Sequence, residues 1–394
     1  MTDKVRLAVI GVGTIGTAHV RDIPRTENAV LAAVCDIDAA RARSAGEAAG
    51  VPFYTDYRQM LEKERIGGVI VATPHYDHTP ISIHAMQRGT SVLVEKPEAV
   101  HVRDARRMNE AYQQAKARHP GLIYSIMLMT RTQGPYARLK AMIDAGDLGR
   151  LIRTTWIVTD WFRTQAYYDN GDWRATWSGE GGGVLLNQCP HNLDVYQWLV
   201  GLPARVTGFA AIGKYHDIEV EDEVTGFFEH ENGMVGHFVT TTAESPGTNR
   251  LEIVGENGKV VWEGGKILLA RNETSMLQFL RNSPQPFARV PSHVEEVAFK
   301  DTGESGHRLV IQNFAAAIQD PSTPLIAHGT EGIRGLSLGN AIMLSSWQGK
   351  TVELPLDEEC YERLLKERIA ASKRTAKGKA GTAAIVDASG SFQR

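Results

Sequence analysis

The run Lys4-Val-Arg-Leu-Ala-Val-Ile10, followed at once by Gly11-Val12-Gly13-Thr14-Ile15-Gly16, decides how the chain begins to fold. The apolar run predicts a buried strand, and a helical pattern follows the glycines. Gly11 permits a tight turn, Gly13 leaves room for a pyrophosphate beside the backbone, and Gly16 allows the helix to pack closely on the strand. The stretch therefore predicts a dinucleotide-binding strand, turn and helix.

The second apolar run, Ala29-Val-Leu-Ala-Ala-Val-Cys-Asp36, ends in an acid twenty residues beyond Gly16. A carboxylate there suits the hydroxyls of an adenosine ribose and repels a 2′-phosphate. The sequence therefore favours NAD over NADP, although Arg41 and Arg43 leave NADP open. Asp36 could also cap the alanine-rich helix that begins after Asp38.

Two more strands predict a parallel sheet, because each is followed by a helical pattern. The strand Gly68–Thr73 leads through His75-Tyr-Asp-His78 into a helix over Thr79–Arg88, and the strand Thr90–Val94 ends at Glu95-Lys96-Pro97. Parallel strands place their carboxyl ends at one edge of the sheet, where ligands bind. We therefore expect a cofactor site built from Gly11, Gly13, Thr14, Ile15, Gly16, Asp36, Thr73, Pro74, His78, Glu95 and Lys96. His78 either lines this crevice or caps its helix.

Lys96 stands at the lip of a buried strand, where an ammonium group loses hydration and its pKa shifts downward. Such an amine is suited to proton transfer at neutral pH. The alternative is an ordinary ion pair with Glu95 at the strand end. A helix over Val102–Arg118 and a strand over Leu122–Met129 complete the predicted first domain.

An aromatic-rich segment follows and holds four of the seven tryptophans between Trp156 and Trp177. Flat aromatic faces suit the C–H faces of a sugar or inositol ring, so we expect Trp173 to line a substrate site. Arg163 and Arg174 offer forked donors to hydroxyls or to an anionic group. A buried seam between domains would also explain these aromatics.

Three adjacent glycines, Gly181 to Gly183, precede a segment that we predict to be one helix carrying Asn187 and His191. Residues four apart share a helix face, so this polar pair is expected to line the substrate pocket. A hydrogen-bonded core histidine is the alternative for His191.

Beyond Gly201, five alternating or β-branched segments joined by Asn-Gly turns predict an antiparallel meander. They are Arg205–Ile212, Val224–His230, Gly233–Thr242, Leu251–Gly255 and Lys259–Trp262. Helices near His307–Ile318 and Thr330–Trp347 should return beside the site, with His307 a candidate to reach it. We predict an α/β fold with a nucleotide domain over residues 1–130, an α+β domain with an open, mainly antiparallel sheet over 131–370, and a mobile tail over 371–394.

Composition excludes several classes of protein. A net charge of −3 gives no basic footprint for nucleic acid. No window reaches about 18 apolar residues, and the N-terminus enters a strand directly, so we expect no membrane span, no signal peptide and a cytoplasmic location. Cys35, Cys189 and Cys360 are scattered, so neither a disulfide framework nor a metal site is expected.

The chain resembles the Gfo/Idh/MocA family of oxidoreductases, which includes glucose-fructose oxidoreductase and inositol dehydrogenase. The resemblance rests on Gly11–Gly16, Ala72-Thr73-Pro74, Glu95-Lys96-Pro97, and Gly181–Gly183 followed by Asn187 and His191. It implies a Rossmann domain, a nicotinamide cofactor, and a second domain whose open sheet forms homodimers or homotetramers. It also implies that Lys96 acts on the reacting hydroxyl and that His191 assists.

One departure from the family concerns Asn187, where many relatives carry Asp. An amide keeps the hydrogen bonding but cannot hold a proton. The role of His191 is therefore open, unless Asp160, Asp172 or Asp194 substitutes for the missing carboxylate.

Three functions fit the sequence. The first is an NAD-dependent dehydrogenase that oxidises a secondary hydroxyl of a cyclic sugar, sugar acid or inositol. The second is an NAD-dependent redox glycosidase, in which oxidation, elimination, hydration and reduction cleave a glycoside that could be acidic. The third is a non-catalytic NAD-binding regulator, against which the presence of both Lys96 and His191 argues.

Overall fold

The N-terminal part of the chain, up to Ile126, forms a parallel sheet in a computed structural model, which describes residues 4–171, 173–301 and 303–372. Its strands run in the order β3-β2-β1-β4-β5-β6, and every pairing is parallel. This is the doubly wound Rossmann order. The strands are β1 Val5–Ile10, β2 Ala29–Cys35, β3 Phe53–Tyr54, β4 Gly68–Val71, β5 Ser91–Val94 and β6 Tyr124–Ile126.

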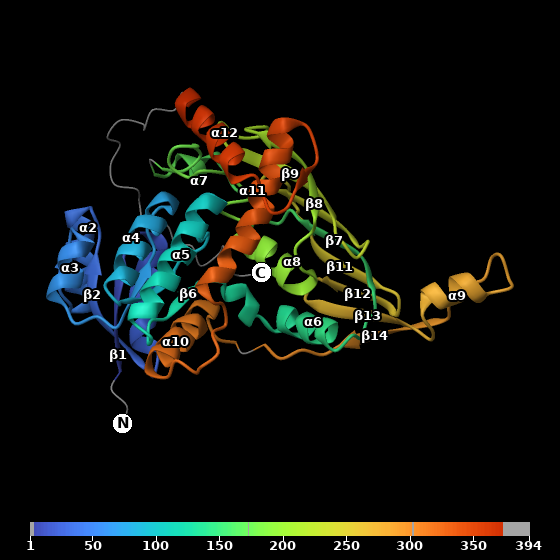
Figure 1. Cartoon of the computed structure of the whole chain (residues 1–394), viewed down its shortest axis with the longest axis horizontal. Coiled ribbons are helices and arrows are strands. Elements are labelled where there is room, and N and C mark those ends of the chain that lie inside the picture. Colours follow the sequence, from blue (N-terminus) through green and yellow to red (C-terminus); the bar gives the residue numbers. More distant parts are fainter. Residues whose placement is uncertain (1–3, 172, 302, 373–394) are drawn as a thin grey trace.

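The helices that alternate with these strands cover the sheet (Figure 1). They are α1 Thr14–Asp22, α2 Ala39–Ala49, α3 Tyr57–Lys63, α4 His75–Gln87 and α5 Val102–Arg118, with short 3₁₀ turns at Ile23–Arg25 (η1) and Met129–Thr132 (η2). The prediction for α5 is confirmed. The helix predicted at Thr79 begins instead at His75, because Pro74 precedes its first turn and Pro80 removes only one hydrogen bond near the helix start.

The C-terminal half forms a nine-stranded sheet in the order β14-β13-β12-β11-β7-β10-β9-β8-β15. Its pairings are antiparallel except for β7 with β10, which is parallel. The strands are β7 Leu151–Val158, β8 Arg205–Ile212, β9 Glu221–Glu229, β10 Val235–Thr241, β11 Asn249–Gly255, β12 Gly258–Glu263, β13 Lys266–Asn272, β14 Ser292–Val297 and β15 Val352–Glu353. The expected open, mainly antiparallel sheet is confirmed, but β7 enters it between β10 and β11, so the strands do not form a simple meander.

One face of this sheet is covered by helices and the other is open. The helices of this half are α6 Gly134–Asp144, α7 Gln165–Asp169, α8 Pro190–Val200, α9 Met276–Asn282, α11 Gly332–Gln348 and α12 Glu358–Ala371, with a 3₁₀ turn η3 at Gly329–Glu331. Figure 1 shows α6, α8 and α11 on the side facing the Rossmann sheet, while α9 extends past the sheet edge. Phe209 on the open face is 68% exposed. The expected homodimer or homotetramer stays a prediction.

The helix α10, Gly306–Gln319, crosses back to the N-terminal sheet. Its buried residues Val310, Ile311 and Phe314 pack in one cluster with Leu7 and Val9 of β1. The Rossmann sheet is therefore completed by a helix from the far end of the chain, and the division of the chain at residues 130 and 370 stays a prediction.

A second difference lies just before α8. The predicted helix through Leu185 and Asn187 is wrong, because residues 183–189 form turns and α8 begins at Pro190. Proline has no N–H to donate to Leu186, so it ends the turn and starts a new helix. Asn187 and His191 consequently do not share a helix face.

The predicted tail falls almost wholly outside the described residues, since α12 ends at Ala371 and the description stops at Ser372. Among the described helices, none is both long enough and apolar enough to cross a membrane.

Candidate active site

The glycine loop after β1 has the geometry that its residues predict. Gly11 has a φ of +87°, and a Cβ on Gly16 would lie 1.8 Å from the Gly11 carbonyl oxygen, so neither position accepts a side chain. A Cβ on Gly13 would meet nothing within 4 Å, so space is open beside the backbone at that point. This is the cradle that a dinucleotide pyrophosphate requires, with Thr14 and Ile15 opening α1.

Asp36 lies beside this loop at the end of β2. Its Oδ2 accepts the Val12 N–H at 2.9 Å and its Oδ1 accepts the Asp38 N–H at 3.0 Å. The alternative role as a helix cap is wrong, because Asp38 accepts the Ala40 and Arg41 amides at the start of α2. Both carboxylate oxygens are therefore fixed beside the glycine loop. Arg41 lies 3.6 Å from Asp36 and is also held by Asp38.

His78 joins two strand-end loops of the predicted crevice. Its Nδ1 lies 2.8 Å from the Pro97 carbonyl oxygen and its Nε2 lies 2.9 Å from the Thr73 carbonyl oxygen. Pro74, not His78, occupies the cap position of α4. His78 therefore fixes the segment after β4 against the segment after β5.

Glu95 is bound to a residue that the sequence reading missed. Its Oε1 lies 2.7 Å from Nε2 of His19 in α1, and its Oε2 accepts the Lys96 backbone N–H at 3.1 Å. Although burial opposes ionisation, the hydrogen bond from His19 lowers the pKa of Glu95 to about 2. The simple Glu95–Lys96 ion pair considered from the sequence is therefore wrong.

Lys96 points across the boundary between the two halves of the chain. Its Nζ donates to the backbone carbonyl oxygen of Asn187 at 2.7 Å. A cavity of about 20 Å³ beside it is lined from both halves, including Ile126, Leu186 and Pro190. Burial lowers the pKa of the Lys96 amine from its ordinary value, partly offset by the charge of Glu95.

His191 lies in the first turn of α8 and is 6% exposed. Burial, with the nearby charge of Lys96, lowers the pKa of His191 to about 3, so the ring is neutral at physiological pH. Its Nδ1 is buried without a hydrogen-bond partner in the described part of the chain. His307, at the start of α10, has its ring centroid 5.7 Å from that of His19, the residue that binds Glu95, so it lies at the edge of the candidate site.

The carboxylates considered as substitutes for an aspartate at position 187 are engaged elsewhere or not described. Asp194 is held by two hydrogen bonds of 2.8 Å from Arg131. Asp160 accepts from Asn249 at 3.3 Å, and Asp172 lies outside the described residues. Neither described acid replaces the missing aspartate.

The aromatic segment divides into core and site residues. Trp156, Tyr168 and Trp177 are buried in the hydrophobic core. Trp173 and Tyr167 are half-buried, and the Arg174 guanidinium lies 4.6 Å from the centroid of each ring.

The arginines of this segment gather around Tyr167. The Tyr167 hydroxyl accepts from Arg174 at 2.6 Å, from Gln188 at 3.1 Å and from Asn187 at 3.3 Å. Arg163 lies 5.1 Å from the same ring. Two guanidinium groups thus converge near the carbonyl that holds Lys96.

A second residue missed from the sequence is Glu180, which is 1% exposed. Its carboxylate accepts the Ala175 N–H at 2.7 Å and the Asn187 side-chain amide. Burial raises the pKa of Glu180, and the charges of Arg174 and Lys96 oppose that rise. An acid placed among the glycines at 179 to 183 was the available signal.

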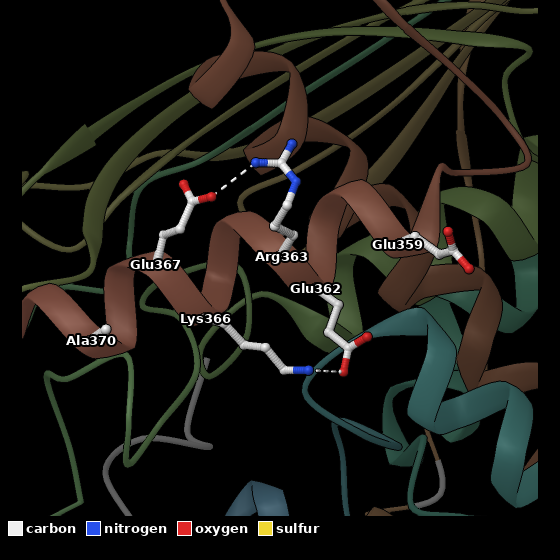
Figure 2. Close-up of a pocket in the computed structure, with 6 residues that line it drawn as sticks. All are labelled: Glu359, Glu362, Arg363, Lys366, Glu367 and Ala370. Carbon is white, nitrogen blue, oxygen red and sulfur yellow. Dashed lines mark hydrogen bonds and ion pairs between the residues drawn. The ribbon is translucent and has the colours of Figure 1, made fainter.

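One surface hollow carries no predicted site residue. It has a volume of about 480 Å³ and lies along α12 (Figure 2). Its charged side chains pair along the helix, Arg363 with Glu367 and Lys366 with Glu362, so the hollow is a solvated helix face. Among the described residues, no cluster of His, Cys, Asp and Glu could hold a metal ion.

The comparisons with known proteins agree with this geometry. Residues 5–119 match the oxidoreductase family with an NAD-binding Rossmann fold, and residues 136–261 match the Gfo/Idh/MocA C-terminal domain. The chain belongs to the Gfo/Idh/MocA family. Residues 5–119 therefore form an NAD-binding Rossmann domain.

Relatives along this sequence include scyllo-inositol 2-dehydrogenase (NAD(+)) of Bacillus subtilis, which is 24% identical over 90% of this chain and 97% of its own length. Inositol 2-dehydrogenase of Salmonella typhimurium is 31% identical over 37% of this chain and 43% of its own length. The chain thus spans the first relative almost fully and less than half of the second.

Solved structures show the same fold. WlbA dehydrogenase of Bordetella pertussis, in complex with NADH and UDP-GlcNAcA, is 27% identical with a TM-score of 0.74, covering 90% of this chain and all of its own. Levoglucosan dehydrogenase, in complex with NADH and levoglucosan, is 21% identical with a TM-score of 0.71 over the same shares, and it supports the fold alone.

Proposed function

We propose that the protein is an NAD-dependent dehydrogenase that oxidises a secondary hydroxyl of a cyclic sugar, sugar acid or inositol, with Lys96 as the general base. The observation that carries this proposal is the Lys96 amine, held at 2.7 Å by the Asn187 carbonyl where the two halves of the chain meet. Alcohol oxidation needs a group that takes the hydroxyl proton and has a pKa near the working pH. Burial lowers the pKa of the Lys96 amine toward that range.

The residues of the Rossmann crevice are suited to hold the cofactor. The glycine loop would receive the pyrophosphate, Asp36 the ribose hydroxyls, and the segment of Thr73, Pro74 and His78 the nicotinamide end. When bound, the nicotinamide ring supplies the hydride acceptor. Lys96 takes the proton from the substrate oxygen, and the neutral His191 ring hydrogen-bonds the same oxygen and orients it.

The arginines favour an acidic ring as the substrate. Arg174 and Arg163 converge on Tyr167, and Trp173 offers a half-buried ring beside them. Guanidinium forks bind carboxylates in two parallel hydrogen bonds. The WlbA dehydrogenase, whose complex holds UDP-GlcNAcA, is similar to 90% of this chain over all of its own length. We therefore place sugar acids first among the candidate substrates.

The test is NADH formation by the purified protein with NAD and a panel of inositols, hexoses and hexuronates, the last both free and linked to a nucleotide. We expect turnover with at least one member and a fall in kcat of about 100-fold or more in Lys96→Ala, since general base catalysis contributes about that much. Lys366→Ala is the control because that lysine is exposed on α12. Unchanged turnover in Lys96→Ala would reject the mechanism, and glycoside cleavage without NADH would favour the redox glycosidase.

A further inference from the structure

Glu180 is a buried acid whose carboxylate oxygens both accept hydrogen bonds from N–H groups. Its Oε2 accepts the Ala175 N–H at 2.7 Å, and its Oε1 accepts a hydrogen bond from the Asn187 side chain. An ionised carboxylate only accepts, so these contacts favour the charged form. They also assign the orientation of the Asn187 amide, because only its nitrogen can donate to a carboxylate.

The backbone around Glu180 is strained in a way that maintains these contacts. Ala175 has a φ of +64°, the one positive φ among the described residues other than glycine. L-residues rarely adopt this conformation, and such strain gathers at functional sites. In this conformation, the Ala175 N–H is aimed at the Glu180 carboxylate.

With the amide in this orientation, the side-chain oxygen of Asn187 remains available as an acceptor. Its Nδ2 donates to Glu180 and to the Tyr167 hydroxyl, and its backbone oxygen accepts from Lys96 Nζ. Its Oδ1 makes no hydrogen bond with the part of the chain that the structure describes. That oxygen is a hydrogen-bond acceptor on the same residue whose backbone carbonyl binds the Lys96 amine.

We infer that Glu180 is the positioning carboxylate of the active site: it orients the Asn187 amide so that Oδ1 accepts a hydrogen bond from a substrate hydroxyl, and its negative charge stabilises the protonated Lys96 amine. Glu180 thus supplies the charge that an aspartate at position 187 would carry. The inference rests on the proposed function, in which Lys96 is the general base. Glu180 acts through Asn187 and Lys96 and does not itself contact the reacting atoms.

Several charged groups determine how strongly Lys96 responds to Glu180. The two carboxylates that face it are Glu95 and Glu180, and Glu95 is already bonded to His19. The cationic and imidazole groups around the amine are Arg163, Arg174, His75, His191 and His307. Burial lowers the pKa of His75, His191 and His307, so the permanent cations near the amine are Arg163 and Arg174. Removing the charge of Glu180 leaves Glu95 as the carboxylate that opposes them, which favours the neutral amine more than in the parent.

The first experiment measures Lys96 directly, without any substrate. The rate of Lys96 acetylation by acetic anhydride is followed against pH by mass spectrometry in the parent and in Glu180→Gln. We expect the midpoint for Lys96 to fall by about one pH unit in Glu180→Gln, because loss of a nearby opposite charge destabilises the ammonium form. Glu256→Gln is the control: its carboxylate also accepts a backbone N–H, that of Arg150, and it lies at the turn between β11 and β12, away from Asn187 and Lys96. Its midpoint should match the parent.

The second experiment removes the carboxylate at position 180 and then places one at position 187. With the substrate found in the panel, Glu180→Gln should lower kcat by about 10- to 100-fold, since misplaced site groups cost about that much. Its acidic limb should also move to lower pH. The double variant Glu180→Gln with Asn187→Asp restores one carboxylate and one amide in exchanged places, and we expect it to recover most of kcat and the parent pH profile.

These outcomes separate the inference from the function on which it rests. An unmoved Lys96 midpoint in folded Glu180→Gln overturns the inference, whether or not a substrate has been found. If the double variant keeps the melting temperature of the parent but does not recover kcat, the inference is also overturned. Full turnover in Lys96→Ala instead overturns the proposed mechanism. The acetylation result does not depend on that outcome, because it is measured without substrate.

Discussion

Lys96 is half-buried and His191 is buried, and their surroundings shift the two pKa values to different extents. Burial lowers the pKa of both, but Lys96 faces the carboxylates of Glu95 and Glu180, which oppose the fall. His191 instead faces the charge of Lys96, and its pKa falls to about 3. Burial therefore moves the pKa of the amine in the direction that general base catalysis requires, whereas the imidazole is neutral and can only serve as a hydrogen-bonding group.

This difference predicts the pH dependence of the reaction. Oxidation needs Lys96 unprotonated, so kcat/KM should rise with pH along one limb and reach a plateau. His191→Asn should lower the plateau about 10- to 100-fold, because it removes the group that orients the substrate oxygen. The limb should stay in place, because His191 is already neutral throughout that range. Initial rates against pH in both proteins test this, and a displaced limb would show that His191 is the titrating base.

At the scale of elements, the β1 turn and α1 show how two glycines in one motif serve different purposes. A Cβ on Gly16 would strike the Gly11 backbone at 1.8 Å, so Gly16 is required by helix packing. A Cβ on Gly13 meets no atom within 4 Å, so nothing in the chain itself requires that glycine. The requirement for Gly13 lies with the cofactor.

The two alanine variants should therefore behave differently. Gly13→Ala should keep the melting temperature of the cofactor-free protein and weaken NAD binding at least about tenfold, because the methyl group occupies the approach of the pyrophosphate. Gly16→Ala should lower the melting temperature, because backbone must move to admit the methyl group. Thermal melts with and without NAD, together with fluorescence titration, provide the measurement. Equal melting temperatures in the two variants would contradict this assignment.

At the scale of the whole molecule, two sets of contacts join the Rossmann domain to the rest of the chain. The helix α10 returns to cover the Rossmann sheet, and Phe314 packs with Leu7 and Leu93 beneath it. Arg131, in the 3₁₀ turn that leaves the Rossmann sheet, binds Asp194 of α8 and Glu331 of η3. This buried ionic group fixes the helix that carries His191 against the domain that carries Lys96.

Breaking that group should be costly. Arg131→Ala leaves Asp194 buried without its cation, and we expect a loss of about 3–5 kcal/mol in the free energy of unfolding. Adding Asp194→Asn should restore part of the loss, because the buried charge is then removed as well. Urea unfolding measures both, with Arg363→Ala on exposed α12 as the control. A loss as small as that of the control would mean that Arg131 is a solvated surface group.

The sequence by itself determined the Rossmann half, the glycine cradle, Asp36, and the placement of Lys96 at a strand end. These features depend on local rules: apolar runs make buried strands, particular turns demand glycine, and parallel strands share one carboxyl edge. The strand β8 and the helix α5 follow from the same periodicities, which need no knowledge of distant residues. Even the error at α8 was local, because the significance of Pro190 was visible in the sequence.

Tertiary structure alone decided which groups meet. Nothing in local sequence pairs His19 with Glu95, Arg131 with Asp194, or the Lys96 amine with the Asn187 carbonyl, because each contact joins segments brought together only by packing. Glu180 differs from these pairs, because its partners at 175 and 187 are close in sequence, but they belong to turns without a periodic signal and only the acid among the glycines pointed to it. Burial set the pKa directions, and burial is a property of the folded molecule.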